Sequence, residues 1–186
     1  YTSGVQLDYF KVDQKAPDLV NRLADDVLGY DVRSATATSF VLGQKIYTPK
    51  NIKISGAQNN DRPWAGWLYT GYALTNLYNT HSDEFTMLAG IVGPASLAEH
   101  TQKFIHKNIT DSPKPMGWDN QIHTEPGVVL AWERRWPHYV DGEILGGMWQ
   151  LEPSVSTSLG NVATYGGAGI TVTFGPNQKE LQDTPP

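Results

Sequence analysis

The feature that most constrains this 186-residue chain is a regular alternation of apolar and polar residues along unusually long segments. The clearest case runs from residue 128 to 136. One face of it carries Val128, Leu130, Trp132 and Trp136. The other carries Glu133 and Arg135, and Arg134 is the exception. A period of two places successive side chains on opposite faces of a β-strand. The pattern predicts an all-β chain whose strands separate an apolar from a polar environment.

Seven segments follow this pattern, and several exceed the usual globular strand of about 5–6 residues. They are residues 3–12, 32–47, 62–79, 84–92, 128–136, 144–158 and 162–174. A tilted crossing of a bilayer needs strands of about 9–11 residues. The segments therefore favour an antiparallel transmembrane β-barrel, and a soluble β-sandwich is the alternative.

The connections between these segments support the barrel. Short ones at 80–83 and 138–143 alternate with long ones at 48–61 and 93–125, an asymmetry typical of outer-membrane barrels. Two connections break the rule. Residues 13–31 predict a short amphipathic helix on the short-turn side, and 159–161 is a tight turn on the long-loop side.

Composition excludes several other classes of protein. The net charge of −5 and the absence of a basic cluster argue against nucleic-acid binding. The chain has no cysteine, which removes disulfide frameworks and thiolate metal sites. No apolar run approaches the roughly 18 residues of a membrane helix, and a mean hydropathy of −0.40 also fits a barrel with a polar lumen.

Both ends of the sequence stop abruptly, and seven is an odd number of strands. An open sheet edge cannot face lipid, because its backbone groups would be unsatisfied there. We therefore expect residues 1–186 to be a single barrel domain truncated at both ends.

The long connection at 93–125 carries the candidate chemistry. Ser96 followed by Glu99 is a capping-box pattern and predicts a helix over about 96–108. Gln102 and His106 are four residues apart, so they share a stripe of that helix. A histidine can act as a general base because its pKa is close to neutrality. The alternative is a solvated helix with a surface histidine.

Familiar catalytic motifs are absent from the sequence. It contains no G-x-S-x-G elbow, no H-E-x-x-H motif and no glycine-rich phosphate loop. This argues against an ordinary serine hydrolase or a zinc enzyme, and it leaves open attack by water with a histidine base and a hard cation.

Several stretches, in this order along the chain, resemble the lipid A 3′-O-deacylase family of outer-membrane proteins. They are Ile46–Pro49, Asn60–Tyr69, Gly93–Ser96, Gln102 with His106, Gly117–Gln121 and Glu133–Trp136. The resemblance implies a monomeric twelve-stranded barrel in the bacterial outer membrane, of which this chain would supply strands two to eight. It also implies an active site between the barrel wall and a helix in an extracellular loop, here 93–125.

The resemblance implies the reaction as well, which is calcium-dependent hydrolysis of the 3′ acyl ester of lipid A. On this basis His106 resembles the catalytic base, Gln102 its helical neighbour and Thr2 a hydroxyl-bearing site residue. Arg62, next to Asp61, is a candidate for binding a phosphate of lipid A, because a guanidinium matches phosphate geometry. The alternative is a lumen-facing ion pair between Arg62 and Asp61. The calcium ligands stay unassigned, because the family's Asn-Asp pair lies on a strand that this sequence lacks.

The sequence is also compatible with other functions. The chain could belong to another outer-membrane acyl hydrolase, such as a phospholipase, or to a non-catalytic barrel. We expect residues 1–186 alone to be inactive, and we expect the tryptophans at 64, 67, 118, 132 and 136 to form an interfacial girdle. Segment 13–31 departs from the family, and it could be an insertion without function.

Overall fold

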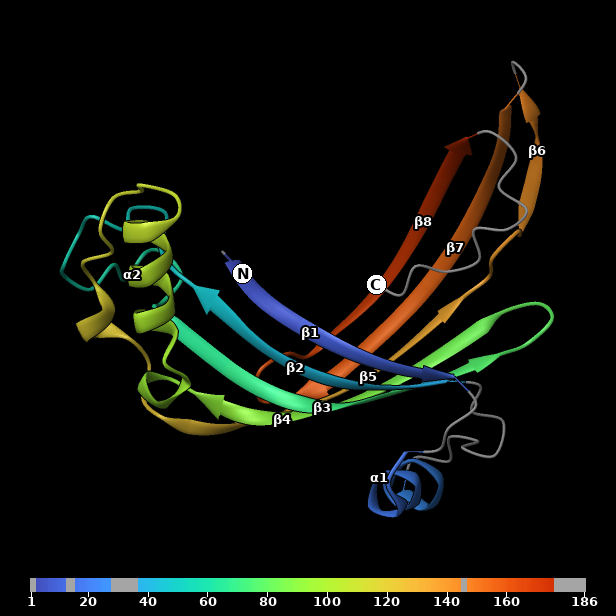
Figure 1. Ribbon diagram of the computed structural model, residues 1–186, viewed down its shortest axis with the longest axis horizontal. Coiled ribbons are helices and arrows are strands. Elements are labelled where there is room, and N and C mark those ends of the chain that lie inside the picture. Colours follow the sequence, from blue (N-terminus) through green and yellow to red (C-terminus); the bar gives the residue numbers. More distant parts are fainter. Residues whose placement is uncertain (1–2, 13–15, 28–36, 145–146, 176–186) are drawn as a thin grey trace.

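A computed structural model of the chain describes residues 3–12, 16–27, 37–144 and 147–175. It is one curved antiparallel sheet in which most strands pair with their neighbours in the sequence (Figure 1). The eight strands are β1 (Ser3–Val12), β2 (Ala37–Tyr47), β3 (Ala65–Leu77), β4 (Ser82–Val92), β5 (Glu125–Arg135), β6 (Val140–Ile144), β7 (Gly147–Gly160) and β8 (Tyr165–Gly175). The all-β prediction is confirmed.

The two faces of the sheet differ in chemistry. The concave face carries many polar and charged side chains, among them Gln6, Asp8, Ser39, Lys45, Glu84, Glu133 and Ser156. The alternate residues, such as Leu7, Phe40, Leu42, Ile170 and Val172, are apolar and exposed on the convex face. A barrel wall has this distribution, with a polar lumen and an outward apolar surface.

The concave face is not polar throughout. Near one end of the sheet Val41, Trp67, Tyr69, Val92 and Val129 form a buried apolar cluster, in which Trp67 stacks on Tyr69 with ring centroids 4.3 Å apart. Glu133 and Arg135 lie on this side of β5 and form an ion pair of 3.0 Å along the strand. The charges of Glu84 and Glu152, on neighbouring strands, also favour the charged form of Arg135.

Strands β5 and β6 share one place in the wall, end to end along the same edge of β7. Arg135 pairs with Ser154 and Val140 with Leu151, so residues 136–139 bulge opposite residues 152–153. His138 adopts a left-handed φ of 53° in this bulge. The predicted turn at 138–143 is wrong, because β6 continues the strand to Ile144 before the chain reverses.

The two ends of the sheet have different connections. Short links join β3 to β4 and β6 to β7 at one end, whereas residues 48–64 and 93–124 form long connections at the other end. The link from β7 to β8, residues 161–164, is short although it lies at the long-loop end. Outer-membrane barrels place short turns on the periplasmic side and long loops outside, so we refer to the short-turn end and the loop end below.

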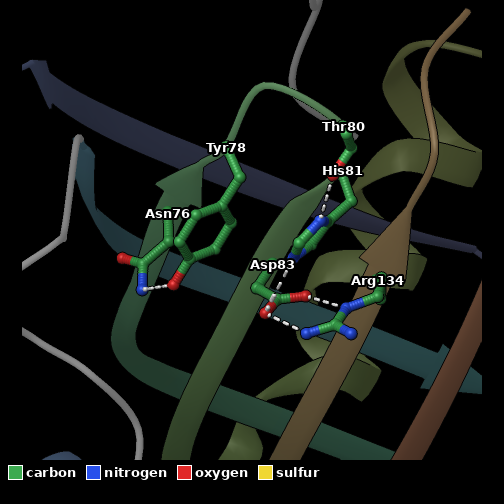
Figure 2. A network of polar contacts seen from close by, with 6 residues as sticks. All are labelled: Asn76, Tyr78, Thr80, His81, Asp83 and Arg134. Carbon is green, nitrogen blue, oxygen red and sulfur yellow. Dashed lines mark hydrogen bonds and ion pairs between the residues drawn. The ribbon is translucent and has the colours of Figure 1, made fainter.

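An ion-pair network lies beside the β3–β4 turn at the short-turn end (Figure 2). Arg134 on β5 binds the buried carboxylate of Asp83 on β4 through two hydrogen bonds of 2.7 Å each. His81 lies 3.9 Å from the same carboxylate and stacks on Tyr78. Arg134, the exception to the alternation of β5, thus has a partner on the neighbouring strand.

The predicted helix in residues 13–31 is present as two short elements, α1 (Asp18–Arg22) and the π-helical turn η1 (Leu23–Val27). They lie under the convex side of the sheet near the short-turn end (Figure 1). Ala16, Val20 and Ala24 pack there against wall residues that include Leu74, Phe85 and Trp132. No helix of the described residues is long and apolar enough to cross a membrane.

Candidate active site

Helix α2 (Ala98–Asn108) stands at the loop end of the sheet (Figure 1). The start of its loop is tied to β3 by a hydrogen bond of 2.9 Å from Gly93 N to Gly66 O. Gln44 on β2 donates a bond of 2.6 Å to the carbonyl of Ser96. Because Gln44 and Gly66 alternate with the concave-face residues Lys45 and Trp67, this attachment is on the outer side of the wall.

Gly66 lets the loop approach β3 closely. A Cβ atom at this position would overlap the Oγ of Ser96 and the Cβ of Ala98. Both residues are fully buried, and Ala98 packs with Ile46, Trp64 and Trp118 in a cluster that joins helix, wall and loop. The start of α2 is therefore fixed against the wall by packing on a glycine.

The predicted capping box is wrong. Residues Pro94–Ser96 form a separate 3₁₀ turn, η3, and Ser96 Oγ donates to the carbonyl of Gly93 at 2.6 Å. Leu97 then adopts a left-handed φ of 59°, and α2 begins at Ala98 with no side-chain cap. Glu99 makes an ion pair with Lys103 one turn later.

Two loops of different origin meet beside α2. Met116 N donates to Ile52 O at 2.9 Å, and Ile122 N donates to Trp64 O at 3.0 Å. These bonds clamp residues 48–64 against the segment that contains the short 3₁₀ helix η4 (Trp118–Asn120). The loop end of the wall is thus covered by one connected structure instead of two independent loops.

Gln102 lies on the face of α2 that is turned into this structure. Its side chain is only 3% exposed, and its Oε1 accepts a hydrogen bond of 2.9 Å from the indole Nε1 of Trp118. Because an indole N–H can only donate, the contact identifies the accepting atom as oxygen. The amide NH₂ of Gln102 is consequently turned away from Trp118.

His106 lies one turn further along α2 and is half-buried. Its Nδ1 is 2.7 Å from the carbonyl oxygen of Pro113. A carbonyl oxygen can only accept, so Nδ1 carries the hydrogen, and in the neutral imidazole the free lone pair belongs to Nε2. This partner assigns the tautomer of the ring.

Asp61 and Arg62 lie in the loop between β2 and β3, at the same end of the wall. The carboxylate of Asp61 accepts the backbone N–H groups of Lys50 at 2.7 Å and of Arg62 at 2.8 Å. These bonds hold the pKa of the Asp61 carboxyl below its usual value. Asp61 thus braces the loop, and the positive charges of Lys50 and Arg62 also favour its ionised form. Both Asp61 and Arg62 lie in the loop at the rim, outside the strands of the wall.

The structure brings together only some of the predicted residues. Gln102 and His106 share α2 and are each held by residues of the segment that follows it, Trp118 and Pro113. Thr2 lies outside the described residues.

Three of the tryptophans that we expected in an interfacial girdle are buried inside the protein. Trp64 and Trp118 pack on each other beneath α2, with ring centroids 5.1 Å apart, and Trp67 faces the lumen. Sequence reasoning therefore missed Trp118 as a functional candidate. Trp118 is sixteen residues from Gln102 in a separate loop segment, and no sequence pattern indicated that the two side chains form a hydrogen bond.

A calcium site would need several oxygen ligands, usually including carboxylates. Among the described residues no group of three or more His, Asp or Glu side chains is close enough to hold a metal ion. Asp119 and Glu125, two acidic residues of the segment that follows α2, are both exposed. The described residues do not fit a carboxylate-rich calcium site on their own.

The fold and the helix at its rim define an outer-membrane β-barrel protein. A family model described as outer membrane protein LpxR matches residues 1–183, so the chain belongs to that family. The comparison with solved structures includes LpxR from Salmonella typhimurium, with a TM-score of 0.71 and 25% sequence identity over 94% of this chain. That match covers 53% of the solved protein, so the chain spans about half of its length. No curated protein gives a significant match.

Proposed function

We propose that this protein is an outer-membrane esterase that removes the 3′-linked acyl chain of lipid A, acting as a monomer with residues 93–125 outside the cell. The observation that carries the proposal is the fixed imidazole of His106 on a helix at the outer side of the wall, in a chain of the LpxR family. Lipid A lies in the outer leaflet, so a site on the lipid-facing side of the rim is accessible to it.

In the proposed reaction His106 acts as the general base. With Nδ1 committed to Pro113 O, the lone pair of Nε2 is available to take a proton from water. The resulting hydroxide attacks the ester carbonyl carbon, and the tetrahedral intermediate then breaks its bond to the sugar oxygen. The imidazolium returns the proton to that oxygen, which leaves a free hydroxyl on lipid A and a released fatty acid.

Gln102 suits a role in stabilising negative charge in this reaction. Trp118 holds its Oε1, so the NH₂ group is the part left to donate. A preorganised donor next to a developing oxyanion lowers the barrier more than a mobile one, because it needs no reorganisation during the reaction. We propose that this NH₂ group donates to the carbonyl oxygen of the substrate.

Arg62 and Asp61 have different proposed roles. The guanidinium of Arg62 matches phosphate geometry, and its loop is clamped to the segment that follows α2. Asp61 holds the backbone of Arg62 and thereby positions it. We propose that Arg62 binds a phosphate group of lipid A and that Asp61 acts on the substrate only through Arg62.

Calcium dependence remains a proposal that rests on the family resemblance alone. If calcium takes part, its ligands include groups beyond the side chains described here, since these lack a suitable cluster. Chelation with EDTA followed by calcium replacement would test it. Full activity in EDTA would remove calcium from the proposal.

The reaction class can be tested by mass spectrometry of lipids from cells that express the protein from its complete gene. The proposal predicts lipid A lighter by one 3′-linked acyl chain, with unchanged phospholipids. Accumulation of lysophospholipid with intact lipid A would instead identify a phospholipase. No change in either lipid would identify a non-catalytic barrel.

A further inference from the structure

A groove lies between the start of α1 and the outer face of the wall, near the short-turn end. Its volume is about 450 Å³, and its lining comes from β1, β2, β3 and the segment that leads into α1. The lining residues are Tyr9, Lys11, Ala16, Pro17, Phe40 and Tyr72, together with Thr38. The groove is on the opposite end of the wall from α2 and His106 and plays no part in the proposed reaction.

Most of the lining is apolar or aromatic. Phe40 and Tyr72 pack edge to face, with ring centroids 5.5 Å apart, and form the wall side of the groove. Exposed Leu7 and Leu42, on the same convex face, continue the apolar surface towards the middle of the sheet. A groove that runs into the lipid-facing surface of a barrel suits an acyl chain.

One cation borders the groove. The Nζ of Lys11 lies 5.4 Å from the centroid of the Tyr9 ring, and the Lys11 side chain is exposed. A lysine beside an aromatic ring at the edge of the apolar band is placed to meet an anionic headgroup. The groove thus combines an apolar channel with a positive charge, which is the chemistry of a lipid site.

The exposed residues of α1 also indicate contact with lipid. Ala16, Val20 and Ala24 face the wall at a spacing of four, and Leu19 and Leu23 form a second stripe at the same spacing. Leu19 is 70% exposed and Leu23 44% exposed, whereas Asp18, Arg22 and Asp25 supply the polar side. A helix with an unburied leucine stripe and a charged side fits a membrane interface.

We propose that α1 and η1 lie in the periplasmic interface of the outer membrane and that the groove binds a glycerophospholipid of that leaflet. One acyl chain would occupy the aromatic groove, the phosphate would pair with Lys11, and Leu19 and Leu23 would enter the lipid beside it. Residues 16–27, the described part of segment 13–31, are then a lipid-binding anchor and not an insertion without function.

The depth of the helix can be measured directly, because residues 1–186 contain no cysteine that would compete for the label. A single cysteine at Leu19 would carry a bimane fluorophore in the protein reconstituted into phosphatidylglycerol and phosphatidylethanolamine vesicles. The matched control is a cysteine at Asp18, the neighbouring residue on the polar side. We expect brominated phospholipid to quench the label at residue 19 and iodide to quench the label at residue 18. Iodide quenching of both labels, with none by brominated lipid, would overturn the interfacial placement.

The groove is tested by native mass spectrometry of the detergent-solubilised protein with palmitoyl-oleoyl phosphatidylglycerol as the probe. We expect Lys11→Gln to weaken retention of one lipid about fivefold, the effect of one basic residue near an anionic surface, and Lys11→Arg to retain it. The matched control is Lys53→Gln, which removes an exposed lysine from the loop end. Equal retention by Lys11→Gln and the wild type, or displacement of the lipid by inorganic phosphate, would overturn the site.

Discussion

The indole Nε1 of Trp118 donates a hydrogen bond of 2.9 Å to Oε1 of Gln102, and both side chains are almost completely buried. The bond links η4 to α2 and orients the amide that we propose as an oxyanion donor. It also gives Gln102 a role that a solvated helix would not require.

Replacing Trp118 by phenylalanine should therefore impair activity more than its loss of volume explains. Trp118→Phe leaves the buried Oε1 of Gln102 without a donor, which costs about 1–3 kcal/mol and lets the amide rotate. We expect the Trp118→Phe protein to remain folded and to have a lower kcat for lipid A deacylation. The fall in kcat should exceed any fraction of the protein that urea titration shows to be unfolded.

The matched control for Trp118→Phe is Trp64→Phe in the same cluster. Among the described residues the indole N–H of Trp64 has no hydrogen-bond partner, so this variant loses a similar volume and no bond. Equal losses of kcat in the two variants would contradict a positioning role for Trp118.

Gly66→Ala should displace the start of α2. The added methyl group would overlap Ser96 Oγ and Ala98 Cβ, and overpacking at such a contact costs about 1–3 kcal/mol. We expect a lower midpoint in urea unfolding together with reduced activity. Gly56→Ala, in the β2–β3 loop, is the control, because nothing lies within 4 Å of its Cβ position. A Gly66→Ala protein that matches this control would show that α2 does not depend on the close contact.

The sequence predicted the wall of this barrel better than its rim. Alternation alone placed Val128, Leu130 and Trp132 outside and Glu133 and Arg135 inside, because strand geometry fixes the side of each residue. It missed the bulge at residues 136–139, since a proline followed by a left-handed histidine also suits a turn. Seven predicted segments nevertheless match the seven places in the wall, with β5 and β6 sharing one.

The candidate site was only partly predictable, because helical periodicity relates residues of one helix and not residues of different segments. The spacing of four residues correctly placed Gln102 and His106 on one stripe of α2. Their partners Trp118 and Pro113 come from a later loop segment, and no periodic pattern governs a loop. The left-handed Leu97 likewise shifted the start of the helix past the serine that the capping-box pattern had indicated.

The pair between Asp83 and Arg134 should matter more for stability than the pair between Glu133 and Arg135. Arg134→Gln leaves a buried carboxylate without its bidentate partner, and we expect a loss of about 1–3 kcal/mol in the free energy of unfolding. Arg135→Gln removes a half-exposed lumen cation and should cost about 1 kcal/mol or less. Urea titration of both variants in detergent would compare them. A larger loss for Arg135→Gln would refute this ranking.

Asp61 should make the order of the β2–β3 loop depend on pH. The N–H groups of Lys50 and Arg62 lower the pKa of its carboxyl from the usual 3.8. A carboxyl whose pKa is lowered by folding stabilises the loop above its unfolded pKa and loses that effect as pH falls through the folded pKa. The amide proton shifts of Lys50 and Arg62 should therefore titrate with a midpoint below 3.8, and Asp61→Asn should abolish the titration. A midpoint at or above 3.8 would contradict the bonding described here.

The most direct measurement for the central claim is the turnover of purified lipid A by His106→Ala, in protein produced from the complete gene and reconstituted in outer-membrane lipid. The matched control is His100→Ala, which removes an exposed histidine from the same helix. Our account predicts a fall in kcat of about 100-fold or more for His106→Ala, with His100→Ala close to wild type. Wild-type release of the 3′ acyl chain by His106→Ala would show that this imidazole is not the base.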